Sequence, residues 1–195
     1  MTKVRSICVY CGSSAQVKDT YVEAAKEVGK LFAKEQKRLV FGGGHVGLMG
    51  VVSDACVEAG GEVLGIMTAF LNEYEGGHTG ITELRIVPNM HERKQQMFEH
   101  SDAFVILPGG LGTLDETFEV LTWKQVGLHG KPIVLLDVEG YWAGLFCTFF
   151  HHMIDQGCGR KEDLSLFTLV QRVEDILPAI QNAPEPNKDF VAKWG

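Results

Sequence analysis

The sequence lacks any long apolar run, and this absence limits where the chain can reside. No stretch of its 195 residues approaches the ~20 consecutive apolar residues that span a bilayer. The first 14 residues are basic and then apolar, but the apolar part is short and interrupted, so we expect a first strand there and no secretion signal. These absences predict a cytoplasmic protein without a membrane partner.

Positive charge and paired cysteines are also scarce. The chain has 18 Lys and Arg against 25 Asp and Glu, a net charge of −7, which disfavours general binding to nucleic acid. Its five cysteines are an odd number without the spacing of a disulfide framework, as expected for reduced thiols. Cys8 and Cys11 form a CxxC pair, but on a strand they point to opposite faces, so we expect two small buried residues. No histidine lies at metal-ligand spacing from another His, Cys or Asp, and we expect neither a metal nor a cofactor.

The chain shows neither an internal repeat nor a dividing linker, and strand and helix patterns alternate along it. We expect one domain over residues 1–182 and a tail over residues 183–195. Alternation of this kind predicts an α/β fold, with a doubly wound, mostly parallel sheet and helices on both faces. Strands are expected at residues 5–10, 38–41, 62–67, 82–87, 103–107, 132–137 and 166–170. Helices are expected at residues 19–36, 48–59, 90–100, 113–126, 142–156 and 173–181, and an irregular loop at 68–80.

Four unusual segments each follow an expected strand. They are residues 11–14, 42–47, 90–94 and 108–113. In open parallel sheets, ligands bind outside the carboxyl ends of the strands. The topology therefore predicts that these segments meet at one edge of the sheet and form a binding site there.

Residues 108–116 read Pro-Gly-Gly-Leu-Gly-Thr-Leu-Asp-Glu. The glycines allow a sharp turn with uncovered N–H groups, and the following helix start favours an anion such as phosphate. We expect Glu116 in the first turn of that helix, where the helix dipole tends to keep its carboxylate ionised. A carboxylate beside a phosphate site suggests chemistry on a phosphorylated molecule. An alternative stays open, because Thr113 and Glu116 also match a capping box, in which the glutamate only caps the helix.

Residues 42–47 formally match the GxGxxG pattern of dinucleotide-binding proteins. The next strand ends without the carboxylate that would bind a ribose, which weakens an NAD-dependent oxidoreductase as an interpretation. A glycine turn that faces a different nucleotide fits better. Close packing of a helix on a strand remains an alternative explanation for these glycines.

Residues 90–94 begin a helix that Asn89 can cap, with Glu92 in the favourable first turn. Arg93 and Lys94 oppose the helix dipole there, typically by ~0.3–1 kcal/mol each. A bound anion would reverse this penalty, and replacing Arg93 with alanine would then leave stability unchanged or slightly improved. A salt bridge, for instance to Glu116, remains the alternative.

Together these segments resemble the LONELY GUY family of cytokinin riboside 5′-monophosphate phosphoribohydrolases. PGGLGTLDE matches the family motif PGGxGTxxE, MHERK matches MHxRK, and GGGHVGLMG and CVYCGSS also fit. The resemblance covers residues 6–170 and implies a Rossmann-like homodimer that hydrolyses the N-glycosidic bond of AMP or an N6-modified AMP. It implies Arg93 and Glu116 as the catalytic pair. The substrate contacts that it implies are Ser13, Gly43, Gly44, Glu75, Arg93, Lys94, Gly109, Gly110, Leu111, Gly112, Thr113, Leu114, Asp115 and Thr122.

Two other interpretations compete with the hydrolase. Bacterial members of this family are often labelled lysine decarboxylase-like, but no lysine here stands out as a Schiff-base partner for pyridoxal phosphate. A non-catalytic nucleotide or cofactor carrier of the same fold is the stronger rival. Such a carrier would not need both Arg93 and Glu116, so their joint presence favours the enzyme.

Overall fold

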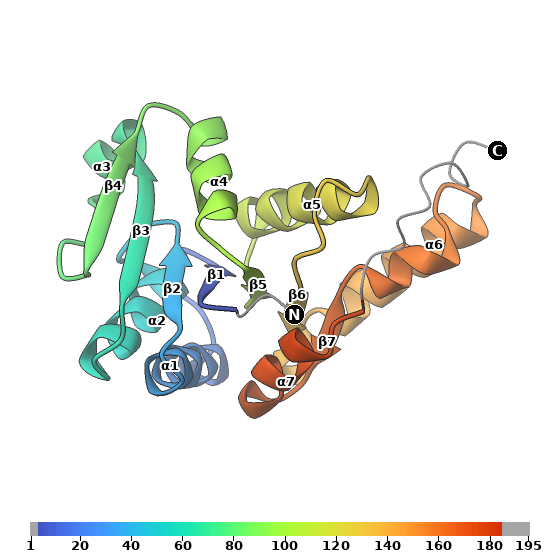
Figure 1. The fold of residues 1–195 in the computed structure, drawn as a ribbon, viewed down its shortest axis with the longest axis horizontal. Coiled ribbons are helices and arrows are strands. Elements are labelled where there is room, and N and C mark those ends of the chain that lie inside the picture. Colours follow the sequence, from blue (N-terminus) through green and yellow to red (C-terminus); the bar gives the residue numbers. More distant parts are fainter. Residues whose placement is uncertain (1–3, 185–195) are drawn as a thin grey trace.

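Seven strands form one sheet at the centre of the computed structural model, which describes residues 4–184 (Figure 1). The predicted tail over residues 183–195 lies outside the described residues from residue 185 onward. The strands are β1 (Ser6–Tyr10), β2 (Arg38–Phe41), β3 (Val63–Thr68), β4 (Glu83–Val87), β5 (Ala103–Ile106), β6 (Ile133–Leu136) and β7 (Thr168–Val170). Their order is β4-β3-β2-β1-β5-β6-β7, and every neighbouring pair is parallel. The predicted α/β fold is therefore confirmed.

The chain reverses its direction of winding at β1. It moves outward from β1 to the edge strand β4, then returns to place β5 on the other side of β1. In open parallel sheets the switch point, here at the carboxyl ends of β1 and β5, is the place where ligands commonly bind. The segments that follow these two strands are Cys11 onward and Pro108 onward, two of the four segments singled out by the sequence.

Helices cover both faces of the sheet. They are α1 (Asp19–Lys34), α2 (Gly47–Glu58), α3 (Ala69–Glu75), α4 (Met90–Glu99), α5 (Leu111–Gln125), α6 (Thr148–Asp155) and α7 (Ile176–Gln181). Figure 1 shows α1, α2 and α7 on one side of the sheet and α4 and α5 on the other. This arrangement gives two hydrophobic cores, one on each face.

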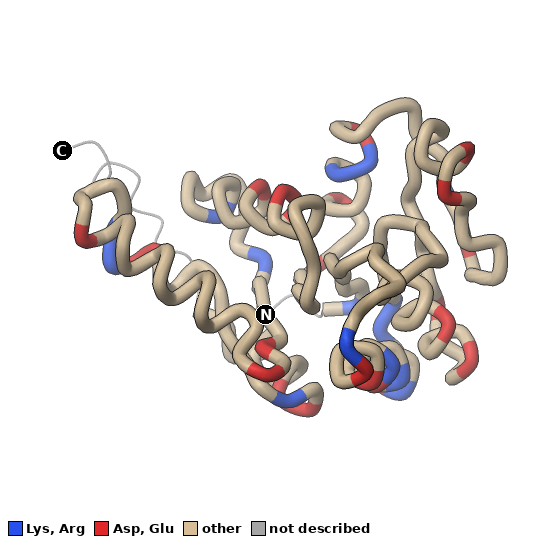
Figure 2. Tube along the Cα trace, turned by 180° about the vertical axis from the view of Figure 1, so that it is seen from behind, with Lys and Arg blue, Asp and Glu red and all other residues tan. Residues whose placement is uncertain are grey.

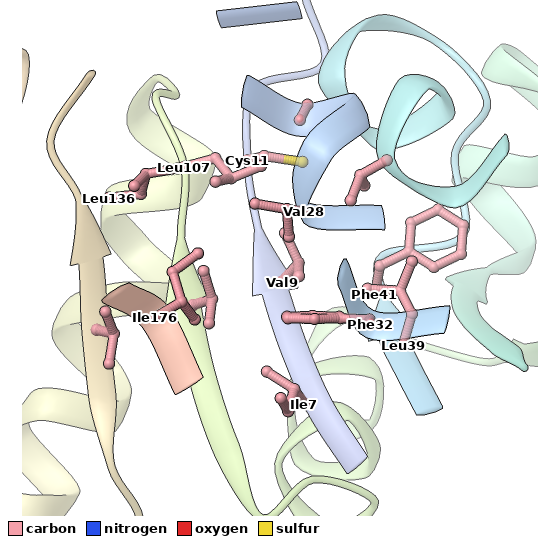
Figure 3. Packing of buried hydrophobic residues seen from close by; sticks show 14 of the residues in the cluster. Ile7, Val9, Cys11, Val28, Phe32, Leu39, Phe41, Leu107, Leu136 and Ile176 are labelled. Carbon is pink, nitrogen blue, oxygen red and sulfur yellow. The ribbon is translucent and has the colours of Figure 1, made fainter. Parts of the chain in front are cut away.

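The first core forms because α1 carries apolar residues at helical spacing. Val28 and Phe32 of this helix are fully buried. Figure 3 shows Phe32 among Val9, Leu39 and Phe41 of the strands beneath it. The second core is aromatic and contains the residues of β1 that point the other way.

Cys8 and Cys11 lie in different cores, as the two-residue period of a strand predicts. Burial raises the pKa of both thiols, so they stay protonated. All five cysteines are free, although Cys147 and Cys158 are exposed. Within residues 4–184 no helix is long and apolar enough to cross a membrane, and no three His, Cys, Asp or Glu side chains gather as a metal site.

Three expected elements differ from the structure. Residues 68–80 were expected to be irregular but contain α3, whose start is capped by the Thr68 hydroxyl accepting a hydrogen bond from Leu71 N (3.1 Å). The expected helix 142–156 divides into a π-helical segment, Ala143–Cys147, and α6. The expected helix 113–126 begins two residues earlier, at Leu111. This last difference changes the position of Glu116.

Candidate active site

The segments that follow the strands pack together at the carboxyl edge of the sheet. Gly12 N donates a hydrogen bond to the carbonyl of Pro108, and Leu48 N donates to the carbonyl of Gly12, both at 3.0 Å. The β1 segment therefore lies between the β5 segment and the start of α2. Arg93, in the segment 90–94 at the start of α4, contacts the glycine turn after β2. The predicted convergence of the four segments is therefore confirmed.

Arg93 is buried, with 6% of its surface exposed, and its guanidinium makes three hydrogen bonds. Nε donates to the carbonyl of Ile66 in β3 (3.0 Å), and Nη2 donates to the carbonyl of Gly42 after β2 (3.2 Å). Nη1 donates to Glu116 Oε1 in α5 at 2.8 Å. A single side chain thus joins β3, the turn after β2 and the helices α4 and α5.

Gly42 leaves the space that the guanidinium occupies. A Cβ at this position would overlap Arg93 Nη2, so a larger residue would displace the guanidinium. Gly43, with φ +79°, and Gly44 are buried against the segment after α3, where Gly43 O accepts a hydrogen bond from His78 N (2.9 Å). Gly43 is therefore packed against β3 and the segment after α3, which differs from the expected alternative of a helix packed on a strand.

Glu116 pairs with Arg93 inside the protein. Only 9% of its surface is exposed. Among the carboxylates of α5, Glu116 is the one that Arg93 contacts in this structure. Burial raises the pKa of the Glu116 carboxyl above its ordinary value, while Arg93 opposes that rise. The expected influence of the helix dipole depended on a place in the first turn, which Glu116 does not occupy because α5 begins at Leu111.

The capping-box interpretation of Glu116 is also wrong. Gly110 is the N-cap of α5 and Leu111 is its first residue, so Glu116 is the sixth helical residue and not in the first turn. Thr113 is already a helical residue, and its side chain occupies the space that a Cβ at Gly109 would need. Glu116 is therefore free to face Arg93 across the helix pair.

Lys94 binds two carboxylates of α5. Its Nζ lies 3.1 Å from Asp115 Oδ2 and 3.0 Å from Glu119 Oε1. Burial by itself lowers the pKa of Lys94, but these two hydrogen-bonded carboxylates more than offset that effect and hold it raised. Arg93 and Lys94 thus both have carboxylate partners. This is the salt-bridge alternative that the sequence left open beside a bound anion. Figure 2 shows the basic segment of α4 and several acidic segments along α5.

The start of α5 remains open. Gly110, Leu111 and Gly112 are exposed, and the N-cap makes no side-chain hydrogen bond. None of the N–H groups of residues 110–113 donates to another residue within 4–184, as is usual in the first turn of a helix without a cap. The glycine-rich end of this helix therefore offers bare donors beside the Arg93–Glu116 pair.

The other predicted contacts differ in how close they come to this pair. Ser13 is exposed on the β1 segment, which packs against Gly109 through Gly12. Glu75 ends α3 and precedes Gly76, whose carbonyl lies 3.1 Å from His45 Nδ1 beside the glycine turn. Thr122 lies on the exposed surface of α5, six residues and about 9 Å along the helix from Glu116. The fold of a single chain does not bring Thr122 to the Arg93–Glu116 pair.

Tyr141 was missed by the sequence reasoning. Its hydroxyl donates to the carbonyl of Gly109 at 2.6 Å, from the segment that follows β6. The signal that identified the other segments was their position after a strand, and the same rule applied to β6 points to Tyr141. The carbonyls of Ile66 and Gly42, by contrast, are backbone atoms without a residue-type signal.

Relatives of known name match the chain along most of its length. A family profile described as "Possible lysine decarboxylase" matches residues 49–180. The cytokinin riboside 5′-monophosphate phosphoribohydrolase LOG1 of Arabidopsis thaliana is 44% identical over 91% of this chain and 86% of its own length. The phosphoribohydrolase LOG5 of the same plant is 38% identical over 98% of this chain and 84% of its own length.

Solved structures share the fold at lower identity. The molybdenum cofactor binding protein of Rippkaea orientalis has a TM-score of 0.70 at 22% identity, over 93% of this chain and 98% of that one. The Moco carrier protein of Chlamydomonas reinhardtii has a TM-score of 0.69 at 21% identity, over 98% and 99%. These likenesses show the Rossmann-like fold alone, whereas the plant enzymes agree in sequence along nearly the whole chain. On that agreement, the chain belongs to the LONELY GUY family of cytokinin riboside 5′-monophosphate phosphoribohydrolases.

Proposed function

We propose that this chain hydrolyses the N-glycosidic bond of a nucleoside 5′-monophosphate, either AMP or an N6-modified AMP. The products are the free base and ribose 5-phosphate. The observation that carries the proposal is the buried Arg93–Glu116 ion pair, 2.8 Å long, next to the bare, glycine-rich start of α5. Relatives up to 45% identical carry the name of this activity, which supports the same conclusion.

The 5′-phosphate binds the N–H groups of residues 110–113. Anions are favoured there because these donors have no acceptor within residues 4–184 and because the helix dipole is positive at this end. Gly109 begins the turn, and its missing side chain allows close packing against Thr113. The remaining proposed contacts, taken from the family motifs, are Ser13, Gly43, Gly44, Glu75, Lys94, Leu114, Asp115 and Thr122.

Glu116 then acts on the sugar. Water attacks C1′ of the ribose, the bond from C1′ to the base breaks, and the electron pair of that bond leaves with the base, which takes up one proton. Glu116 accepts a proton from the attacking water and stabilises the positive charge that develops on the sugar. A carboxylate with a raised pKa is a stronger base, so the burial of Glu116 suits this role.

Arg93 acts through Glu116. All three of its hydrogen bonds go to protein atoms, so it fixes the direction of the carboxylate and balances its charge. Holding a reacting group in one geometry lowers the barrier, because the cost of ordering it is met before the substrate binds. In this proposal Arg93 positions the catalytic base.

Incubation of the protein with AMP and with isopentenyladenosine monophosphate tests the proposal directly. Chromatography of the products should show free base and an equal amount of ribose 5-phosphate from at least one of the two nucleotides. Tight binding without release of base would instead support a carrier protein, the function named for the structural neighbours. If the protein neither binds the nucleotides nor releases base from them, both interpretations are contradicted.

We also propose that the protein acts in the cytoplasm as a homodimer. Two surfaces offer apolar area for a second copy. A groove of about 390 Å³ between α4 and α5 is lined by Phe98, Trp123 and Leu128 among others. The π-helical segment before α6 exposes Leu145, and α6 itself exposes Phe149. Light scattering on the wild type, Leu128→Glu and Leu145→Glu should show a dimer that one of the two variants dissociates. A monomeric wild type would contradict the proposal.

A further inference from the structure

The segment between β6 and α6 reaches across to the start of α5. Tyr141 lies in this segment, and its hydroxyl donates to the carbonyl of Gly109 at 2.6 Å. The Tyr141 ring packs edge-on against Trp142 (4.7 Å between centroids) and against Tyr21 of α1 (5.6 Å). Trp142 is fully buried, so the tyrosine is anchored in the core on one side.

Several contacts fix the backbone that presents Tyr141. Asp137 is buried, and its Oδ1 accepts hydrogen bonds from Trp142 N (2.7 Å) and Ala143 N (2.9 Å). Glu139 adopts a left-handed conformation with φ +53°, which is disfavoured for a residue with a side chain and persists only where the surroundings impose it. Lys18 holds Glu139 through an ion pair of 2.9 Å. The segment is therefore bent into a defined shape that places the Tyr141 hydroxyl.

The hydrogen bond to the Gly109 carbonyl also fixes the direction of the Gly110 N–H. That carbonyl and the N–H of Gly110 belong to one planar peptide group, in which they point in opposite directions. When Tyr141 holds the carbonyl, the N–H of Gly110 is aimed the other way, away from the tyrosine. Gly109 and Gly110 have no side chains to restrict their backbone, so this orientation depends on an outside contact.

We propose that Tyr141 is a positioning residue for the phosphate site, because it orients the peptide between Gly109 and Gly110 so that the Gly110 N–H faces the 5′-phosphate. This inference rests on the proposed function. Donors that are already oriented bind a phosphate without a further ordering penalty. Tyr141 therefore contributes to the affinity for the phosphate group and not to that for the base.

The variant Tyr141→Phe removes only the hydroxyl. We expect the KM for the nucleotide and the inhibition constant of ribose 5-phosphate to rise about three- to tenfold, as for the loss of one hydrogen bond. The affinity for free adenine, which lacks a phosphate, should stay the same. The matched control is Tyr21→Phe, which takes a hydroxyl from the ring packed against Tyr141 but leaves the donor to Gly109 in place. This control should bind ribose 5-phosphate as the wild type does.

Calorimetric binding of ribose 5-phosphate separates this inference from the proposed function. If the wild type binds it but releases no base from any nucleotide, the proposed function fails, and the comparison of affinities still tests Tyr141. Equal affinity of Tyr141→Phe and wild type would overturn the role of Tyr141 and leave the function standing. Equal losses of affinity for ribose 5-phosphate and adenine would also overturn it, because they indicate general loosening of the site. A wild type that does not bind ribose 5-phosphate would overturn the role of Tyr141, whereas the release of free base decides the proposed function independently.

Discussion

The helices α4 and α5 begin at the same edge of the sheet, but only α4 has its first turn capped by a side chain. The start of α4 is closed, because the Asn89 side chain accepts a hydrogen bond from Glu92 N (2.9 Å) and Glu92 adds a favourable charge. The start of α5 has Gly110 as its cap, without a side-chain hydrogen bond and without an acidic residue in the first turn. The comparison indicates that α4 serves to hold the site, by turning Arg93 and Lys94 onto α5. The start of α5, by contrast, is left bare.

The largest effect is expected at Glu116, which joins the two helices. Glu116→Gln keeps the size of the side chain and an oxygen for Arg93 but removes the base. We expect kcat to fall by about 10²–10⁴-fold, the usual contribution of a general base. Release of free base under saturating nucleotide measures this change.

Glu119→Gln is the matched control for Glu116→Gln. Glu119 also lies on α5 and also pairs with a cation of α4, since it lies 3.0 Å from Lys94 Nζ. Its loss should change kcat far less, because it does not contact Arg93 in this structure. Equal losses in the two variants would show that pairing between the helices, and not the base, supports the rate.

Arg93→Ala should give the largest loss of stability. The expectation from the sequence was an unchanged or slightly improved stability, but the structure shows three hydrogen bonds and a buried ion pair that this variant removes. Breaking such a pair leaves Glu116 buried without a counter-charge, which typically costs about 3–5 kcal/mol. Urea denaturation measures the change. A free energy of unfolding within about 0.5 kcal/mol of the wild type, the range for surface substitutions, would contradict this account of the pair.

The pH dependence of kcat sharpens the comparison further. Glu116 must be ionised to act as a base, so the rate should fall as the pH falls through its pKa, by about tenfold per unit well below it. Because burial raises that pKa, the acid limb should lie above the ordinary glutamate value. Arg93→Gln removes the group that lowers the pKa and should move the limb to still higher pH. An acid limb that stays in place in this variant would show that another group titrates.

The smallest effects concern the two helix caps. Asn89→Ala removes the cap of α4 and should lower the free energy of unfolding by about 1 kcal/mol.

Gly110→Asp supplies α5 with a cap and a favourable charge, and should raise stability by about 0.3–1 kcal/mol, since a Cβ at Gly110 meets no atom within 4 Å. The same aspartate should weaken binding of ribose 5-phosphate, because it occupies and repels the anion site. A Gly110→Asp protein with unchanged affinity for ribose 5-phosphate would place the phosphate elsewhere.

Local patterns predicted most of the fold. The strands and the order of the helices follow from apolar periodicity, and the gathering of the loops follows from the topology of parallel strands. The helix α3 was missed because its seven residues are too few to show a period and run directly into the glycines at positions 76 and 77. The start of α5 was placed too late because glycine disfavours helices. Here the bond from Gly12 N to Pro108 O fixes the turn that begins the helix.

The members of the charged cluster between α4 and α5 could be singled out from the sequence, but their pairing could not. Arg93, Lys94 and Glu116 were identified from their positions after strands and at helix starts. That Arg93 contacts Glu116 was one of several possibilities, and the choice depends on how α4 and α5 lie against each other. The carbonyls of Ile66 and Gly42 that complete the arginine's contacts carry no side-chain signal, so only the folded chain shows them.

The absence of a side chain at Gly42 has a consequence for how the protein can change. Because a Cβ there would overlap the guanidinium of Arg93, positions 42 and 93 form one unit, although 51 residues separate them. A residue other than glycine at position 42 would displace the arginine, and without the arginine the nearest remaining neighbour of that Cβ is Met49 Sδ at 3.3 Å. Substitutions at these two positions are therefore strongly non-additive. Once Arg93 has been replaced, position 42 can accept a small side chain. That side chain then blocks the return of an arginine at position 93.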